Sequence, residues 1–208
     1  MTDETFIESV DDLRALLGEP IARVRDKDRP SLHPLDVAWI GASPFVLLAT
    51  ADADGRCDVS PRGDPPGSVK VLSPTALALP ERPGNKRADS LLNVLANPQV
   101  GLLFLIPGRN DTLRVNGRAK VVSDAAYFAD LEVKGHRPSV VLRVDVEQVF
   151  YHCAKAFMRS TLWEPETWAP DAVPARPHIA KAIERPESSM EELEAYYGPS
   201  YAEKLYRG

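Results

Sequence analysis

The alternation of apolar and polar residues changes its period near residue 43. Before that point, apolar residues between 5 and 17 recur at the spacing of one helix face, and the run stops at Gly18. The prolines in 28–36 then predict an extended connection, because proline disfavours helix continuation. Residues 1–42 are therefore expected to form a helical lead-in.

From residue 43 onward, short apolar or alternating segments predict about seven strands. A hairpin is expected over 45–60 around the turn sequence DADG, and further strands over 68–73, 75–80, 99–106, 112–122 and 139–151. The last of these changes phase near Gln148, which indicates a β-bulge. Two helices interrupt the strands, one over 87–96 with a buried stripe and a short one over 124–132. The stripe is expected to contain Ala88, Leu91, Leu92 and Leu95.

Short connections between the strands favour antiparallel pairing. The fold class is thus mainly β with helices (α+β), and a small closed or split β-barrel is the economical form, since closure removes sheet edges. Residues 43–163 are expected to be this barrel domain. Residues 164–208 form a Pro/Trp-rich segment and an acidic helical tail, in which Ser188 with Glu191 or Glu192 is expected to start a helix.

Composition narrows the function classes. The net charge of −5 argues against a broad nucleic-acid surface, so an anion site must be local. No apolar run is long enough for a membrane helix, and the first residues are acidic, unlike a signal peptide. Two cysteines are too few for a disulfide framework, so a cytoplasmic protein with reduced thiols is expected.

A cationic cluster precedes the 87–96 helix. Gly84 permits an unusual backbone angle, and Asn85, Lys86 and Arg87 follow it where the free N–H groups of a helix start point outward. Cations at a helix N-terminus oppose the macrodipole at a cost of roughly 0.3–1 kcal/mol each. The cluster either binds a dianion or is a solvated basic turn, and local sequence leaves both open.

Two further polar groups lie on predicted strands. Ser60, Arg62 and Gly63 occur where a strand enters a turn, and a guanidinium there suits a phosphate or carboxylate; a surface pair between Arg62 and Asp64 is the simpler alternative. Thr112 and Arg114 share the polar face of a later strand. That face must meet solvent, a partner subunit or a ligand.

The segment after the last strand is dense in polar chemistry. His152 and Cys153 do not make a metal site, because a tetrahedral zinc needs two more ligands. Neighbours on a strand point to opposite faces, so they do not form a catalytic pair either. A helical turn from Ala154 places Arg159 one turn before Trp163, which suits a flat anionic ligand, or a helix start whose cations lie in water. We predict no metal and assign no catalytic residue.

Taken together, the run RPGN followed by two basic residues and the run HC-x-KA-x-x-R-S-x-LW resemble the pyridoxamine 5′-phosphate oxidase-like FMN-binding split-barrel superfamily, in particular a bacterial branch of it. The resemblance extends from Ser43 to Trp163. It implies a homodimer with FMN at the subunit interface. The chain departs from pyridoxamine phosphate oxidase itself in lacking its Arg-Leu-x-Pro ending, so activity on vitamin B6 is not expected.

The resemblance also implies roles for individual residues. Val59, Ser60, Arg62 and Gly63, with Leu79 and Pro80, would flank the isoalloxazine ring. Asn85, Lys86 and Arg87 would hold the phosphate, Thr112 would reach the ring with Arg114 beside it, and Arg159 and Trp163 would cover the ring from the partner subunit. The implied function is an FMN-dependent oxidoreductase acting on an unidentified small molecule. A non-catalytic flavin-binding or storage protein, or the same fold with a deazaflavin, remains an alternative.

Overall fold

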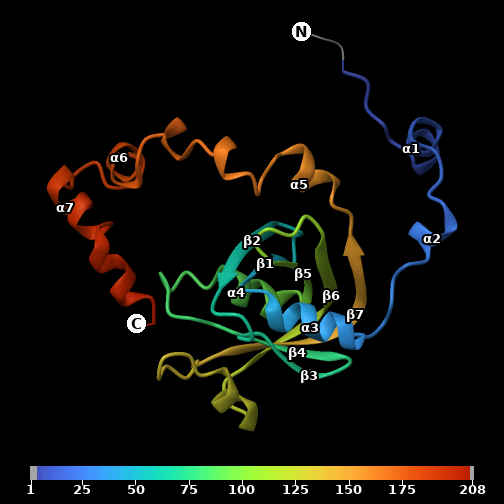
Figure 1. Cartoon of the computed structure of the whole chain (residues 1–208), viewed down its shortest axis with the longest axis horizontal. Coiled ribbons are helices and arrows are strands. Elements are labelled where there is room, and N and C mark those ends of the chain that lie inside the picture. The colour runs from blue at the N-terminus through green and yellow to red at the C-terminus, as the bar shows by residue number, and fades with distance from the viewer. Residues whose placement is uncertain (1–3, 207–208) are drawn as a thin grey trace.

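The computed structural model describes residues 4–206, and its centre is a single antiparallel sheet (Figure 1). The order is β2-β1-β5-β6-β7-β4-β3, so β2 and β3 are the two edges and do not pair with each other. This confirms the predicted antiparallel α+β fold, as a barrel that is split. The strands are β1 (Phe45–Ala51), β2 (Cys57–Gly63), β3 (Lys70–Ser73), β4 (Ala76–Pro80), β5 (Gln99–Leu105), β6 (Thr112–Val122) and β7 (Val141–His152).

The sheet curves around one apolar core, to which alternate residues of most strands contribute. On β6, Leu113 and Val115 are fully buried, whereas Arg118 and Lys120 are exposed, as their alternation predicts. All five residues of β4 are buried, because this strand is covered on both faces. The core cluster is completed by residues such as Ile40, Val46, Leu48, Leu77, Leu102, Phe104, Leu142 and Val149.

The predicted bulge lies between β6 and β7. Asn116 pairs with Gln148 but Gly117 pairs with Val146, which leaves Glu147 as the extra residue. A Cβ atom on Gly117 would collide with the carbonyl oxygen of Asp145, so the backbones approach too closely here for any other residue. The bulge lets the two longest strands bend without losing their pairing.

Helix α4 (Asp89–Ala96) differs from the prediction in its start and in its buried face. It begins after Ala88, and Leu92 and Leu95 of the predicted stripe are 59% and 71% exposed. Ser90 and Val94 are buried instead. The reason is polar: Ser90 Oγ donates to Asp58 and Asn93 Nδ2 to Thr50, which turns this side of the helix toward the β1–β2 hairpin.

A further helix, α3 (Pro34–Ala42), begins within the extended connection expected over 28–36 and takes its last three residues, while 28–33 are not helical. Pro34 occupies the first turn, where its missing N–H costs nothing, and His33 caps the helix with Asp36. Asp36 is buried and forms two hydrogen bonds with Arg29, at 2.5 and 3.0 Å. Burial alone raises the pKa of Asp36, but the hydrogen bonds from Arg29 and His33 N–H outweigh it and lower the pKa.

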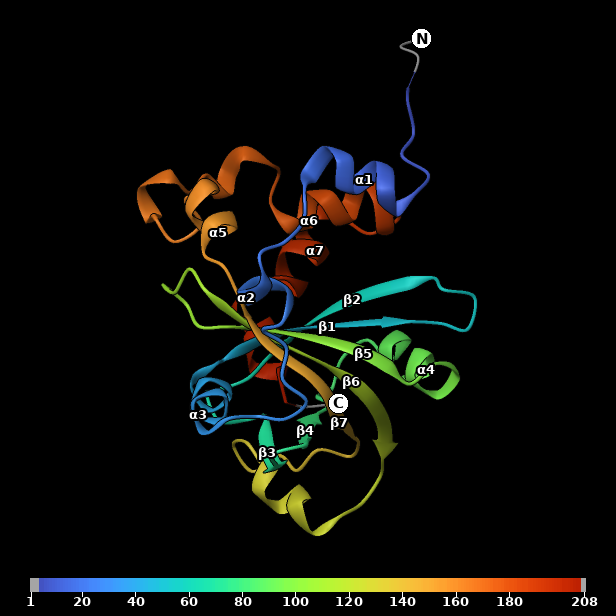
Figure 2. The same cartoon turned by 90° about the vertical axis from the view of Figure 1, so that its right-hand side faces the viewer.

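Helical segments flank the barrel at both ends of the chain (Figures 1 and 2). Before it lie α1 (Val10–Leu17) and α2 (Ala22–Arg25), whose residues are not buried. After η1 (Ala126–Leu131) and β7 come α5 (Lys155–Arg159), two 3-10 turns (Pro165–Thr167 and Pro170–Ala172), α6 (Arg176–Ile179) with a π-helical continuation (Ala180–Glu184), α7 (Met190–Tyr196) and η5 (Pro199–Lys204).

These segments refine two predicted boundaries. The first helix starts at Val10, four residues later than the apolar spacing implied. Ser9 is its N-cap residue, because the Ser9 side chain accepts a hydrogen bond from the backbone N–H of Asp12. The last helix is capped by Ser189 and Glu192 in a reciprocal box, not by Ser188. Within residues 4–206, no helix has the length and apolar composition needed to cross a bilayer.

The bulge supports a direct test by paired glycine substitutions. Gly117→Ala forces a Cβ atom into the β7 backbone and should lower the free energy of unfolding by about 1–3 kcal/mol or more, as measured by denaturant titration. Gly41→Ala is the control, since a Cβ atom there meets nothing within 4 Å and α3 gains roughly 0.5–1 kcal/mol. Equal effects of the two substitutions would contradict the close approach.

Candidate functional site

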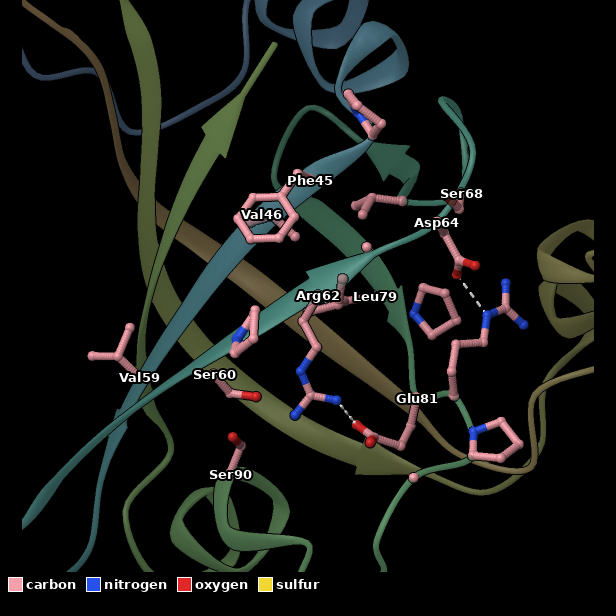
Figure 3. A pocket seen from close by; sticks show the side chains of 18 of the residues that line it. Phe45, Val46, Val59, Ser60, Arg62, Asp64, Ser68, Leu79, Glu81 and Ser90 are labelled. Atoms are coloured by element: carbon pink, nitrogen blue, oxygen red, sulfur yellow. Dashed lines mark hydrogen bonds and ion pairs between the residues drawn. The ribbon is translucent and has the colours of Figure 1, made fainter. Parts of the chain in front are cut away.

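A cavity lies along the gap between β2 and the connection from β4 to α4 (Figure 3). Its volume is about 480 Å³, in the range of small-molecule sites. We call its two ends the α4 end, formed by residues 84, 85 and 87–90, and the Asp64 end, formed by Asp64, Ser68, Arg82 and Leu205. The middle is lined by Val59, Ser60, Pro61, Arg62, Gly63, Leu79, Pro80 and Glu81.

Two ion pairs cross this gap. Arg62 on β2 pairs with Glu81, which follows β4, and the two side chains are 17% and 27% exposed. Arg82 Nε lies 2.6 Å from Asp64 Oδ2, with both side chains nearly buried. Arg82 also donates to the carbonyl of Leu131 at 2.9 Å. The local alternative of an Arg62–Asp64 pair is therefore wrong, because each of these residues has a partner on the far side of the gap.

The cavity lining is close to neutral. It contains three arginines, Arg62, Arg82 and Arg87, and four carboxylates, Asp58, Asp64, Glu81 and Asp89, a formal net charge of −1. Most of these charges are already paired with one another. An anion therefore has no general cationic field to enter, and the α4 end must supply its binding locally.

At the α4 end the backbone adopts unusual angles. Lys86 and Ala88 have φ of 62° and 57°, whereas Gly84, predicted to take such a conformation, does not. Asn85 Oδ1 accepts from the backbone N–H of Arg87 at 3.0 Å, and no side chain caps α4. The first N–H groups of α4 are thus available to a ligand, and left-handed residues of this kind form concave N–H surfaces that suit anions.

The two cations at this end are exposed. Arg87 Nε lies 2.8 Å from Asp89 Oδ2, and this hydrogen bond raises the pKa of Arg87. The Arg87 side chain is 72% exposed, and exposed pairs of this kind contribute little to stability, so a stronger anion can displace Asp89. Lys86 lies beside this end without lining the cavity.

One buried polar atom in the cavity wall has no partner. Arg62 donates from Nη1 to Glu81, but its Nε is buried and forms no hydrogen bond within the part of the chain that the structure describes. Such a donor costs free energy unless it is satisfied. A ligand with a carbonyl or hydroxyl oxygen in the middle of the cavity would satisfy it once the Arg62 side chain turns Nε toward the cavity.

Eight of the predicted site residues thus line one cavity: Val59, Ser60, Arg62, Gly63, Leu79, Pro80, Asn85 and Arg87. The remaining four, apart from Lys86, lie elsewhere. Thr112 is buried at the start of β6, and the Arg114 guanidinium lies 5.0 Å from the centre of the Phe150 ring. Arg159 is exposed on α5, while Trp163 stacks on Phe157 and donates from Nε1 to the carbonyl of Arg109.

Several residues that line this cavity were not predicted from the sequence. Asp58 is two residues before Ser60 on the same strand, so the strand period alone could have indicated it. Glu81 and Asp64 are partners of arginines far along the chain, and Leu205 comes from the tail, so no local pattern indicates them. Within residues 4–206, no three His, Cys, Asp or Glu side chains converge as a metal ligand set would.

A family profile described as pyridoxamine 5′-phosphate oxidase matches residues 32–153, more than half of the chain. The protein belongs to this family. The match covers all seven strands and the whole middle and α4 end of the cavity, but not the tail that contributes Leu205. No curated protein matches the chain.

Solved structures with a similar fold cover little more than this core. A putative pyridoxamine 5′-phosphate oxidase from Lactobacillus delbrueckii is 29% identical, with a TM-score of 0.45 over 59% of this chain and 95% of that one. HupZ from Group A Streptococcus is 20% identical (TM-score 0.47; 58% and 93% covered). An FMN-binding protein from Syntrophomonas wolfei is 10% identical (TM-score 0.43; 57% and 82% covered).

The ion pair across the gap can be measured by a double-mutant cycle. Arg62→Ala, Glu81→Ala and the double variant should give a coupling free energy of about 1–2 kcal/mol, because both side chains are mostly buried. The control is the exposed pair Arg137–Asp124, for which we expect a far smaller coupling. Similar couplings in the two cycles would show that the gap is solvated like a surface.

Proposed function

We propose that this member of the family is an FMN-dependent oxidoreductase, and that the cavity between β2 and the β4–α4 connection is its flavin site. The observation that carries the proposal is that one cavity joins the uncapped start of α4, with its free N–H groups, to a middle that has an apolar wall at Leu79 and Pro80 and an unsatisfied donor on Arg62. A flavin mononucleotide has this same sequence of parts: a phosphate, a polar chain and a flat ring with carbonyl oxygens.

The phosphate belongs at the α4 end. There it would accept from the free N–H groups at the start of α4 and from Arg87 once that side chain leaves Asp89. Lys86, on the adjacent turn, adds a second charge without entering the cavity. The near-neutral lining supports this assignment, because only this end offers cations whose partners are weak.

The ring belongs in the middle of the cavity. Leu79 and Pro80 are buried and give it an apolar wall, while β2 residues 59–63 form the opposite wall. Arg62 Nε would donate to a ring oxygen, and the positive charge of the same guanidinium group would favour an electron-rich ring. When bound, FMN supplies hydride or electron-pair transfer at its N5 position; the protein binds it, orients it and excludes water.

A homodimer completes this proposal. Thr112 and Arg114 share a face of the sheet with Phe150 and His152, their partners on β7, and this face is opposite the core. Arg114 and Trp163 therefore lie outside the cavity of their own chain. We propose that Arg114, Arg159 and Trp163 contact the flavin held by the second subunit, whereas Thr112, which is buried in its own chain, does not reach it.

Flavin titration of the purified protein tests the cofactor. We expect FMN to bind, with absorbance near ~450 nm and a raised melting temperature. Lys86→Ala with Arg87→Ala should weaken FMN at least tenfold but leave riboflavin, which lacks the phosphate, nearly unchanged. The matched control is Arg23→Ala with Arg25→Ala, which removes the same charge from α2.

Four results would contradict the proposal or part of it. Failure of FMN to bind or stabilise the protein would exclude the flavin site, and equal losses for FMN and riboflavin would place the phosphate elsewhere. Tighter binding of a deazaflavin would replace FMN as the cofactor. A bound flavin that, after photoreduction, is not reoxidised by oxygen, quinones or nicotinamide-derived acceptors would indicate a binding or storage protein.

A further inference from the structure

The tail returns to the cavity at the end opposite to α4. After α7, η5 leads to Leu205, which lines the cavity at the Asp64 end, and to Tyr206. The family match ends at residue 153, so the tail that provides this part of the wall lies outside the shared core of the family. Within the described chain, Leu205 is the only residue of the segment after β7 that lines the cavity, and Tyr206 follows it directly.

Tyr206 is held by several independent contacts. Its OH group donates to Asp64 Oδ1 at 2.8 Å, while Arg82 binds the other oxygen of the same carboxylate. Its ring stacks on His136, with centres 5.9 Å apart and planes at 16°. The cations of Arg82 and Lys134 lie 5.8 and 5.6 Å from the ring centre.

The hydrogen bond from the Tyr206 OH group to Asp64 persists at neutral pH. Burial, and next the hydrogen bond to Asp64, raise the pKa of the Tyr206 phenol above its usual value. The OH group therefore keeps its proton and remains a donor. The tail contact and one of the ion pairs across the gap share the Asp64 carboxylate, so the position of the tail and the closure of the gap depend on each other.

We propose that Leu205 is a wall of the ligand site and that Tyr206 is the positioning residue that holds it there, so that residues 199–206 control the exchange of the ligand. The identity of this ligand as a flavin rests on the function proposed above. Because the tail lies at the Asp64 end and the phosphate at the α4 end, the tail acts on the ring-bearing part of any flavin and is indifferent to the phosphate.

Flavin dissociation provides the first test. Tyr206→Ala should speed the dissociation of both FMN and riboflavin by roughly tenfold, the effect of losing one hydrogen bond to a charged group and the ring contacts. Tyr206→Phe keeps the ring and loses only the OH group, so its effect should be intermediate. Tyr196→Phe on α7 makes the same chemical change at a tyrosine away from the cavity and should leave the rate unchanged.

A thiol-labelling experiment tests the wall without any ligand. Cys57 and Cys153 are exposed, so both are replaced by serine, and a single cysteine is then introduced by Ser68→Cys beside Asp64 or by Ser60→Cys nearer Arg62 (Figure 3). Adding Tyr206→Ala should speed maleimide labelling at position 68 by about fivefold or more, because the wall opens locally. Labelling at position 60 should change far less.

The outcomes separate this inference from the proposed function. Unchanged labelling at position 68, or unchanged flavin dissociation in a Tyr206→Ala protein that binds FMN normally, would overturn the role of the tail while leaving the flavin site intact. A wild-type protein that binds no FMN would overturn the flavin site, yet the labelling rates would still decide whether the tail forms the wall. Melting temperatures of each variant distinguish local opening from unfolding.

Discussion

Two ion pairs span the ends of a sheet whose edge strands do not hydrogen-bond to each other, and the rest of the site depends on this arrangement. Backbone pairing between the edge strands β2 and β3 would close the barrel and fill the gap. Charged side chains span a wider gap than a strand ladder does. The gap therefore stays open as a cavity while its walls remain fixed, and these same side chains set the charge that a ligand meets.

The second constraint is the polar attachment of α4. Ser90 and Asn93 bind Asp58 and Thr50 on the β1–β2 hairpin, so the start of the helix has a fixed position relative to β2. This brings the Asn85–Arg87 turn to one end of the cavity. An apolar stripe on the same face would bury more area but would specify this position less well, because apolar contacts are not directional.

The strands and the bulge could be predicted from the sequence because each has a local signal, whereas the grouping of the site residues came from the family resemblance. Period-two alternation places Thr112 and Arg114 opposite the core, and the phase change at Gln148 marks the bulge. The buried face of α4 differs from the prediction. The apolar spacing points to Leu92 and Leu95, but the hydrogen bonds of Ser90 and Asn93 decide which side of the helix faces the sheet. Helix α3 was not predicted, because a proline usually interrupts a helix, whereas Pro34 occupies the first turn of this one.

The remaining differences depend on contacts between distant segments. Nothing near Arg62 indicates Glu81 as its partner, and nothing in the acidic tail indicates that Tyr206 reaches Asp64. These contacts turn a list of candidate residues into a cavity with two distinct ends.

A crystal structure of the protein reconstituted with FMN tests the central claim most directly. We predict the phosphate at the start of α4 within hydrogen-bonding distance of Arg87, and the ring between β2 residues 59–63 and Leu79–Pro80, with Arg62 Nε donating to it. Flavin bound elsewhere on the sheet, with the gap between β2 and the β4–α4 connection occupied only by water, would contradict it.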